Sequence, residues 1–143
     1  MDIRPARNTL EDIGFILSRH RLIQRDHHGL ADDILKRDIF GENPKARIFM
    51  IEDDKTVGFI LLSFCYWAAV QQILWVSQVY IDEDARGRHF RKIGAWLKQY
   101  AKDNQCAHIV WGTASDADRT LALWDKIGAK NLAGGFSFWA LKP

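Results

Sequence analysis

The sequence is poor in cysteine and proline and has no long apolar run. Its two cysteines, Cys65 and Cys106, each lie in an apolar, strand-like context, without a Cys-x-x-Cys motif or a cysteine–histidine ligand spacing. This pattern favours buried free thiols in a reducing compartment over a disulfide framework or a zinc site. The three prolines, Pro5, Pro44 and Pro143, fall where helices and strands are expected to begin or end.

The sequence shows neither a membrane span nor a leader peptide. Its longest apolar run, residues 57–69, is too short to cross a bilayer and is interpreted as a buried strand. Residues 1–4 lack the apolar stretch of a signal peptide. We therefore expect a cytoplasmic protein with no membrane partner.

Charge of neither sign dominates. The 143 residues include 20 Lys and Arg and 18 Asp and Glu, which gives a formal net charge of +2. Such a balance is not typical of proteins that bind nucleic acid. The hydrophobic content of 48% is sufficient for a core without metal or disulfide. No repeat, low-complexity segment or linker interrupts the chain, so we expect a single domain over residues 1–143.

Histidines near the N-terminus do not form a recognisable metal motif. His20, His27 and His28 lie close to several aspartates, but no His-x-x-x-His or His-x-x-Glu spacing is present. Adjacent histidines point in different directions on a helix or a turn. We expect no metal site.

The apolar spacing and the turn residues predict ten elements. Thr9 is expected to cap the first helix, and Gly41 and Pro44 to end the second. The three central strands should form an antiparallel meander. The elements are a strand at 3–5, a helix after Thr9, a helix at about 30–39, strands at 47–52, 56–66 and 73–81, a helix at about 90–102 whose buried stripe is Phe90, Ile93, Leu97 and Ala101, a strand at 108–112, a helix from its cap Asp118 through Ile127, and a strand at 136–141.

The most distinctive segment runs from Ile81 to Leu97, where a strand leads through Arg86 and Gly87 into a basic helix. The cations crowd the first turn of this helix, where the helix dipole disfavours them, and N–H groups at a helix start favour phosphate. The segment therefore predicts a phosphorylated ligand; the alternative is a solvated helix face. Between Asp84 and Asp103 the charged residues are all positive: Arg86, Arg88, Arg91, Lys92, Lys98 and Lys102.

Four motifs occur in a recognisable order and spacing along the chain: Phe-Gly-Glu-Asn-Pro at 40–44, Val-Gly-Phe at 57–59, the strand followed by Arg86 and Gly87, and Leu-Trp-Asp-Lys-Ile-Gly-Ala-Lys at 123–130. With these motifs the chain resembles the GCN5-related N-acetyltransferase (GNAT) superfamily, and within it most the diamine or polyamine acetyltransferase branch. The resemblance implies an α+β fold in α/β/α layers, with a mixed central sheet of splayed parallel strands flanked by helices.

The resemblance further implies acetyl-CoA as cosubstrate, bound where the strands at 73–81 and 108–112 splay apart. The backbone of Val79, Tyr80 and Ile81 would bind the pantetheine amides. Successive N–H groups in the next loop would hold the pyrophosphate, because a turn that leads into a helix forms an anion nest. The loop residues implied are Arg86, Gly87, Arg88, His89, Phe90 and Arg91.

This loop departs from the family pattern, which has two further glycines after the first. If those glycines serve positive φ angles, each replacement costs roughly 1–2 kcal/mol. If they only allow close approach, the side chains of His89 and Arg91 would crowd the phosphates. The side chains of Arg88 and Arg91 would instead contact pyrophosphate oxygens.

The catalytic positions depart from the pattern as well. Trp124 stands where the family has a tyrosine that protonates the thiolate, and an indole N–H donates a hydrogen bond but keeps its proton. The acidic pair of the polyamine branch matches Ser77 and Gln78 here, neither of which is a strong base. Candidate proton handlers are Ser77 and Gln78 through an ordered water, Tyr80, Tyr66 and His89.

Two functions follow. The first is an acetyl-CoA-dependent N-acetyltransferase that acts by direct transfer on a primary amine of a small molecule or a protein. The alternative is a catalytically impaired protein of the same fold, acting as an acyl-CoA-binding, regulatory or interaction module. Family members often dimerise, and Trp67, at the start of Trp-Ala-Ala-Val (67–70), is a candidate to line either an acceptor pocket or a homodimer contact.

Overall fold

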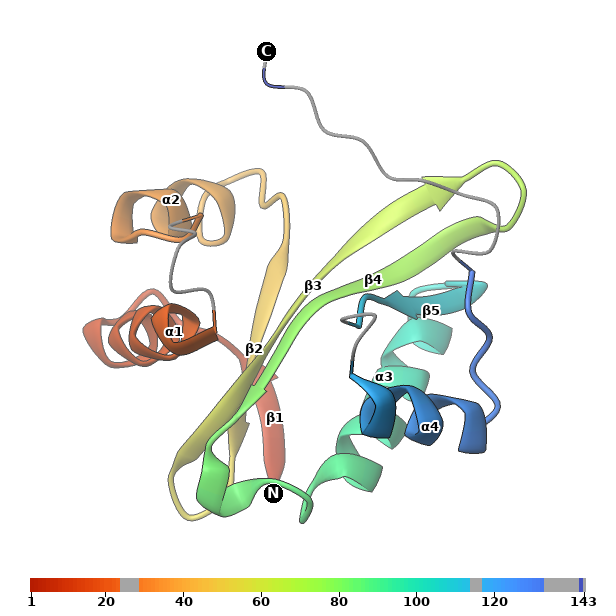
Figure 1. Ribbon diagram of the computed structural model, residues 1–143. Coiled ribbons are helices and arrows are strands. Elements are labelled where there is room, and N and C mark those ends of the chain that lie inside the picture. Colours follow the sequence, from red (N-terminus) through yellow and green to blue (C-terminus); the bar gives the residue numbers. More distant parts are fainter. Residues whose placement is uncertain (24–28, 114–116, 133–141, 143) are drawn as a thin grey trace. The chain divides into compact units, whose positions relative to one another are not determined.

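The computed structural model describes residues 1–23, 29–113, 117–132 and 142 (Figure 1). The chain divides into two units, Met1–Trp111 and Gly112–Pro143, which are described separately. The expectation of a single domain stays a prediction. The strand expected at 136–141 lies outside the described residues.

The first unit is built around a five-stranded mixed sheet. The strands lie in chain order, and three antiparallel pairs are followed by one parallel pair between the last two strands. The antiparallel meander predicted from the sequence is confirmed, as is the mixed sheet. The strands are β1 (Asp2–Pro5), β2 (Arg47–Glu52), β3 (Thr56–Trp67), β4 (Gln71–Ile81) and β5 (His108–Trp111).

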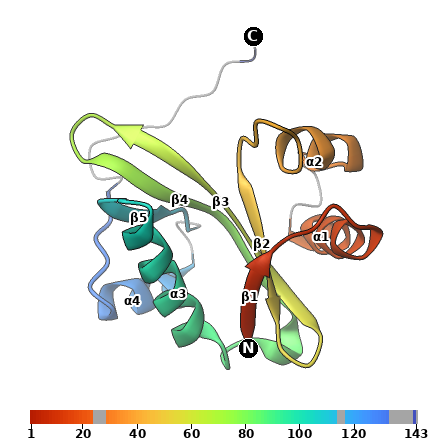
Figure 2. The same ribbon diagram turned by 180° about the vertical axis from the view of Figure 1, so that it is seen from behind.

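Helices cover both faces of this sheet. Helices α1 (Leu10–Ile23) and α2 (Asp32–Asp38) lie on one face and α3 (Phe90–Asp103) on the other, as both ribbon views show (Figures 1 and 2). The cap predicted at Thr9 is confirmed, because its Oγ1 accepts the Asp12 N–H at 3.3 Å. Among the described residues, no helix is long and apolar enough to span a membrane.

Alternation along β2 separates two cores. Ile48 and Met50 pack with the buried residues of α1 and α2, whereas Phe49 and Ile51 pack with Ile93 of α3. Successive side chains of a strand point to opposite faces, so one apolar strand fills both layers.

Phe90 was predicted on the buried stripe of α3, but it is 40% exposed. It is the first residue of the helix, one turn before the stripe reaches the sheet.

A β-bulge changes which face β4 presents. Leu61 of β3 pairs with Gln78 and Leu62 pairs with Val76, so Ser77 is an extra residue in β4. Because of this residue, Val76 belongs to the core under α3 while Tyr80 belongs to the core under α1. An uninterrupted strand would place positions 76 and 80 on the same face.

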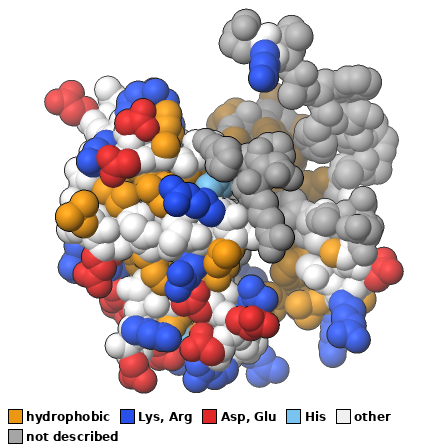
Figure 3. All heavy atoms as spheres, turned by 60° about the vertical axis from the view of Figure 1, so that its left-hand side comes forward, with side chains coloured by type: hydrophobic (Ala, Val, Ile, Leu, Met, Phe, Trp, Pro, Cys, Tyr) orange, Lys and Arg blue, Asp and Glu red, His pale blue; other side chains and the backbone are white. Residues whose placement is uncertain are grey.

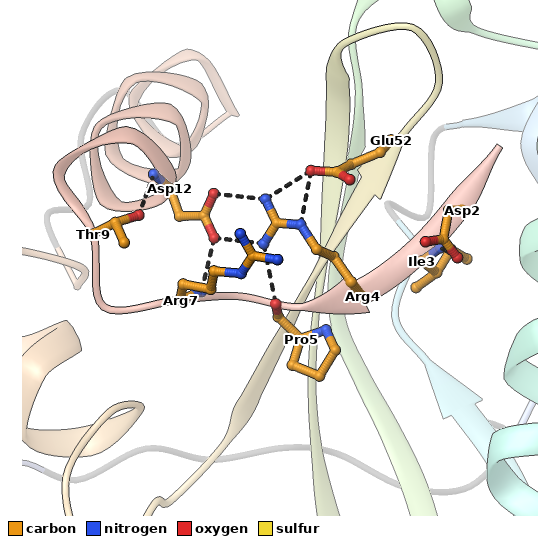
Figure 4. Close-up of polar contacts among 8 residues, drawn as sticks. All are labelled: Asp2, Ile3, Arg4, Pro5, Arg7, Thr9, Asp12 and Glu52. Carbon is orange, nitrogen blue, oxygen red and sulfur yellow. Dashed lines mark hydrogen bonds and ion pairs between the residues drawn. The ribbon is translucent and has the colours of Figure 1, made fainter.

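A buried carboxylate joins β1 to α1 (Figure 4). Asp12 accepts two hydrogen bonds from the Arg4 guanidinium, at 2.7 and 2.9 Å, and one from the Arg7 backbone N–H at 2.7 Å. Arg4 also donates to Glu52 at 2.7 Å. The hydrogen bonds from Arg4 lower the pKa of Asp12, although burial opposes this shift.

Elsewhere over α1 and α2, charged side chains of both signs are intermixed at the surface (Figure 3).

The second unit contains α4 (Asp118–Lys126). Asp118 was predicted as the cap of this helix, but it is the first helical residue, and Ala117 precedes it without a side-chain cap. Gly128 ends the helix in a left-handed conformation, at a φ of 81°, as expected for a glycine just past a helix end.

Candidate functional site

The end of β4 presents an open backbone edge. The parallel pairing with β5 covers Ile73–Val76 and stops at Trp111. Beyond it, residues 77–81 of β4 have no strand partner on that side among the described residues. On the other side these residues pair closely with β3, because a Cβ at Gly58 would lie 2.2 Å from the Tyr80 carbonyl oxygen. An open strand edge offers N–H and C=O groups to an extended ligand.

A groove of about 690 Å³ lies where this strand end, α1 and the following loop meet. The structure thus brings together the predicted pantetheine segment and one predicted pyrophosphate residue, Arg86. The last turn of α1 contributes Leu22 and Ile23 to the same groove. The groove is lined by Leu22, Ile23, Val79, Tyr80, Ile81, Glu83 and Arg86.

The loop after β4 closes on itself through two arginines. It begins with a 3-10 turn at Glu83–Ala85, and Gly87 takes a φ of 84°. The Arg86 Nε–H donates to the Ile81 carbonyl at 3.1 Å, and Arg88 donates through Nη2 to the Asp84 carbonyl at 3.0 Å. A guanidinium has five N–H donors, so each side chain keeps donors for an anion.

The first turn of α3 is basic and uncapped. Arg91 and Lys92 lie exposed in this turn, which contains no acidic residue, and the side chain of His89 does not cap the helix. Neither cation forms an ion pair with a carboxylate of the described residues. The expected accumulation of cations at this helix start is therefore confirmed, and it favours a bound anion.

His89 is turned away from the surface of the loop. Its side chain is buried, and Nε2 lies 3.1 Å from Asp53 Oδ2 in the turn between β2 and β3. Burial raises the pKa of Asp53, but the charges on His89 and the N-terminal ammonium outweigh burial and lower it. His89 itself has a φ of −109°. Among the described loop residues, Gly87 alone has a positive φ, so the two missing glycines impose no φ strain.

Tyr80 is held on the α1 side of the sheet. Its ring stacks on Phe59, with ring centroids 6.1 Å apart. Burial and a hydrogen bond with Asp82 raise the pKa of the phenol, so Tyr80 keeps its proton at neutral pH. Arg19 of α1 fixes Asp82 through a bond of 2.7 Å. Tyr80 is therefore a hydrogen-bond donor rather than a base.

No sequence pattern indicates the contact between His20 and Gln78. His20 Nδ1 lies 3.3 Å from Gln78 Oε1, and the imidazole is buried between α1 and β4. Ser77, the other residue at the acidic-pair positions, is exposed. The described residues contain no cluster of three possible metal ligands, and His27 and His28 lie outside them.

Trp124 lies on α4 in the second unit. Its indole N–H donates to Thr113 Oγ1 at 2.8 Å, within the same unit. This bond occupies the one proton that the indole can donate.

Comparison with known proteins agrees with this architecture. The sequence model of the acetyltransferase (GNAT) family matches residues 13–129. No curated protein sequence matches the chain.

Solved structures share the fold at low identity. A possible acetyltransferase from Clostridium difficile 630 has a TM-score of 0.75 at 18% identity, covering 99% of this chain and 97% of that one. A ribosomal-protein-alanine N-acetyltransferase from Brucella melitensis biovar Abortus 2308 has a TM-score of 0.71 at 15% identity, covering 99% of both chains. An aminoglycoside acetyltransferase from an uncultured soil metagenomic sample has a TM-score of 0.70 at 11% identity, covering 99% and 96%.

Proposed function

We propose the following activity for this chain, which belongs to the acetyltransferase (GNAT) family. It transfers an acetyl group directly from acetyl-CoA to a primary amine of a small molecule or a protein. The observation that carries the proposal is the continuity of the open β4 edge with an uncapped, basic helix start. An extended amide chain and a pyrophosphate need these two features in this order.

The cosubstrate fits the described residues. The backbone of Val79, Tyr80 and Ile81 would bind the pantetheine amides at the open edge. The turn at Gly87 and the N–H groups that begin α3 would bind the pyrophosphate. Arg86 lies at the groove, while Arg88 and Arg91 are exposed beside this turn, so charged hydrogen bonds would add to the backbone contacts.

The chemistry needs two proton movements. An alkylammonium, with a pKa of about 10.4, must lose a proton before its nitrogen attacks the thioester carbon. The C–N bond then forms, the C–S bond breaks, and the thiolate takes a proton from the attacking nitrogen, directly or through water. Tyr80, which keeps its proton, would donate a hydrogen bond rather than accept the first proton. Trp124, whose indole N–H donates to Thr113, would supply no proton.

The acceptor side lacks the acidic pair of the polyamine branch at the two positions where that pair would stand. Ser77 and Gln78 are neutral, so these positions add no attraction for the second ammonium of a diamine. Two of the structural neighbours act on different acceptors by name, a ribosomal-protein alanine and an aminoglycoside. The panel of acceptors to be tested therefore includes a peptide with N-terminal alanine, an aminoglycoside, a diamine and an alkyl monoamine.

The test is thiol release from acetyl-CoA by the full chain, with and without each amine. We expect amine-dependent release, and Arg86→Ala should raise the KM for acetyl-CoA by roughly tenfold, because a charged hydrogen bond contributes about 1.5–3 kcal/mol. Lys98→Ala is the matched control, since it removes an exposed cation two turns into α3. Absence of amine-dependent release across the panel contradicts the proposal.

The same experiment separates the alternative function. The Trp124 and Ser77–Gln78 departures favour an impaired enzyme that still binds acyl-CoA. In that case acetyl-CoA raises the melting temperature without turnover, because micromolar binding at millimolar ligand adds about 4 kcal/mol of stability. The Arg88→Ala/Arg91→Ala double variant should then reduce this shift.

A further inference from the structure

A buried histidine of α1 packs against β4 with one ring nitrogen unused. His20 is 6% exposed, and among the described residues its Nε2 has no hydrogen-bond partner, whereas Nδ1 contacts Gln78. A buried polar atom without a partner costs about 1–3 kcal/mol. Such an atom indicates a donor that arrives with a ligand.

The contact with Gln78 selects a tautomer of the neutral ring. The atom that faces Nδ1 is the amide oxygen of Gln78, which can only accept, so in this tautomer Nδ1 carries the proton and Nε2 the lone pair. The bulge at Ser77 supports this contact, because it turns the following β4 residues toward α1. Nε2 lies on the far edge of the ring from Gln78, is itself buried, and keeps its lone pair for a donor that reaches it when the ligand binds.

The pair lies between the two elements that wall the groove. His20 lies two residues before Leu22 and three before Ile23 on α1, both of which line the groove, and Gln78 immediately precedes Val79 on β4. Building on the proposed function, we propose that His20 Nε2 accepts the proton of the acceptor ammonium. The ammonium N–H bond breaks and an Nε2–H bond forms; the freed amine attacks the thioester, and the imidazolium later returns its proton to water.

The ionisable groups that the structure describes on the elements around His20 are exposed or have other partners. On its own helix, Arg19 is paired with Asp82 and Arg21 is exposed. On β4, Tyr80 is engaged with Asp82. Leu35 of α2 packs in the core that also contains Ile16 and Tyr80. The charged residues of α2 are exposed or paired with each other: Asp32 with Lys36, Arg37 with Asp38, and Asp33 exposed.

The test compares two nucleophiles in the full chain. His20→Gln preserves a polar contact to Gln78 but cannot accept the proton. For an alkylamine we expect kcat/KM to fall about 10²-fold at neutral pH and then to recover as pH rises and free amine accumulates. For an O-alkylhydroxylamine, which is already neutral, we expect a loss of less than about threefold. His108→Gln, at an exposed histidine of β5, is the matched control and should leave both rates unchanged.

A second readout does not depend on turnover. Imidazole nitrogen NMR of the wild-type chain should show His20 in the Nδ1–H form, and an alkylammonium added with CoA should shift Nε2. Gln78→Leu should abolish the preference for this tautomer. Because this variant keeps His20, it tests the contact even if His20→Gln fails to fold. An equal loss with both nucleophiles, or an Nε2–H tautomer in the wild type, overturns the proposal. Absence of turnover in the wild type refutes the proposed function instead.

Discussion

The buried carboxylate at the junction of β1 and α1 allows a stability prediction. In Asp12→Asn one oxygen is replaced by an NH₂ group, so at least one Arg4 N–H faces another donor. Removing one partner of a buried ion pair costs about 3–5 kcal/mol. Arg4 keeps Glu52 as a partner, which places the expected loss near the lower end, at about 3 kcal/mol. For a chain of this length that is a fall in melting temperature of roughly 10 °C.

The assay is urea and thermal unfolding followed by circular dichroism across pH. The pKa of Asp12 is lowered in the folded state, so its contribution is complete above the unfolded pKa of about 4 and is lost as pH falls through the folded value. The difference between wild type and variant should therefore be constant from neutral pH to about pH 5 and shrink below pH 4.

The exposed pair between Arg37 and Asp38 provides the control. Asp38→Asn removes a carboxylate from an ion pair of similar length, 2.8 Å, and should leave stability unchanged within error. A loss of less than about 1 kcal/mol in Asp12→Asn, or a loss that stays the same down to about pH 3, would refute the reasoning.

Two further predictions concern backbone positions. Gln105→Gly should raise the free energy of unfolding by roughly 0.5–1 kcal/mol, because Gln105, just past the end of α3, has a φ of 57° that glycine adopts without strain. Gln99→Gly, inside the helix, should instead lower the free energy of unfolding by about 1 kcal/mol. Gly58→Ala should lower it by about 1–3 kcal/mol, because the new Cβ meets the Tyr80 carbonyl at 2.2 Å. Gly94→Ala, with open space at its Cβ, should not destabilise the chain. Urea unfolding measures all four, and equal effects within either pair would contradict the geometry.

Most of the elements could be predicted because their signals are local. Thr9 and Gly128 mark helix ends through side-chain and backbone chemistry that needs no distant partner. Phe90 was mispredicted because helical spacing continues past the point where the sheet is in reach. The register shift at Ser77 has no local signal, since it depends on how β4 pairs with β3.

The candidate site divides in the same way. The basic helix start and the loop glycine at position 87 are visible in the sequence, because charge and positive φ are properties of single residues. The partner of His89 is not visible, since Asp53 lies in a hairpin 36 positions earlier in the chain. The contact between His20 and Gln78 spans 58 positions and depends on the bulge.

The bulge at Ser77 links the two halves of the site. On one side of β4, pairing with β5 ends at Val76, one residue before the bulge, so the open edge begins there. On the two faces of the sheet, the same extra residue places Val76 under α3 and Tyr80 under α1. Gln78 follows the bulge directly and reaches His20. One inserted residue therefore sets both the start of the edge offered to the cosubstrate and the side chains offered to the acceptor, which makes the register of β4 the structural determinant of the proposed chemistry.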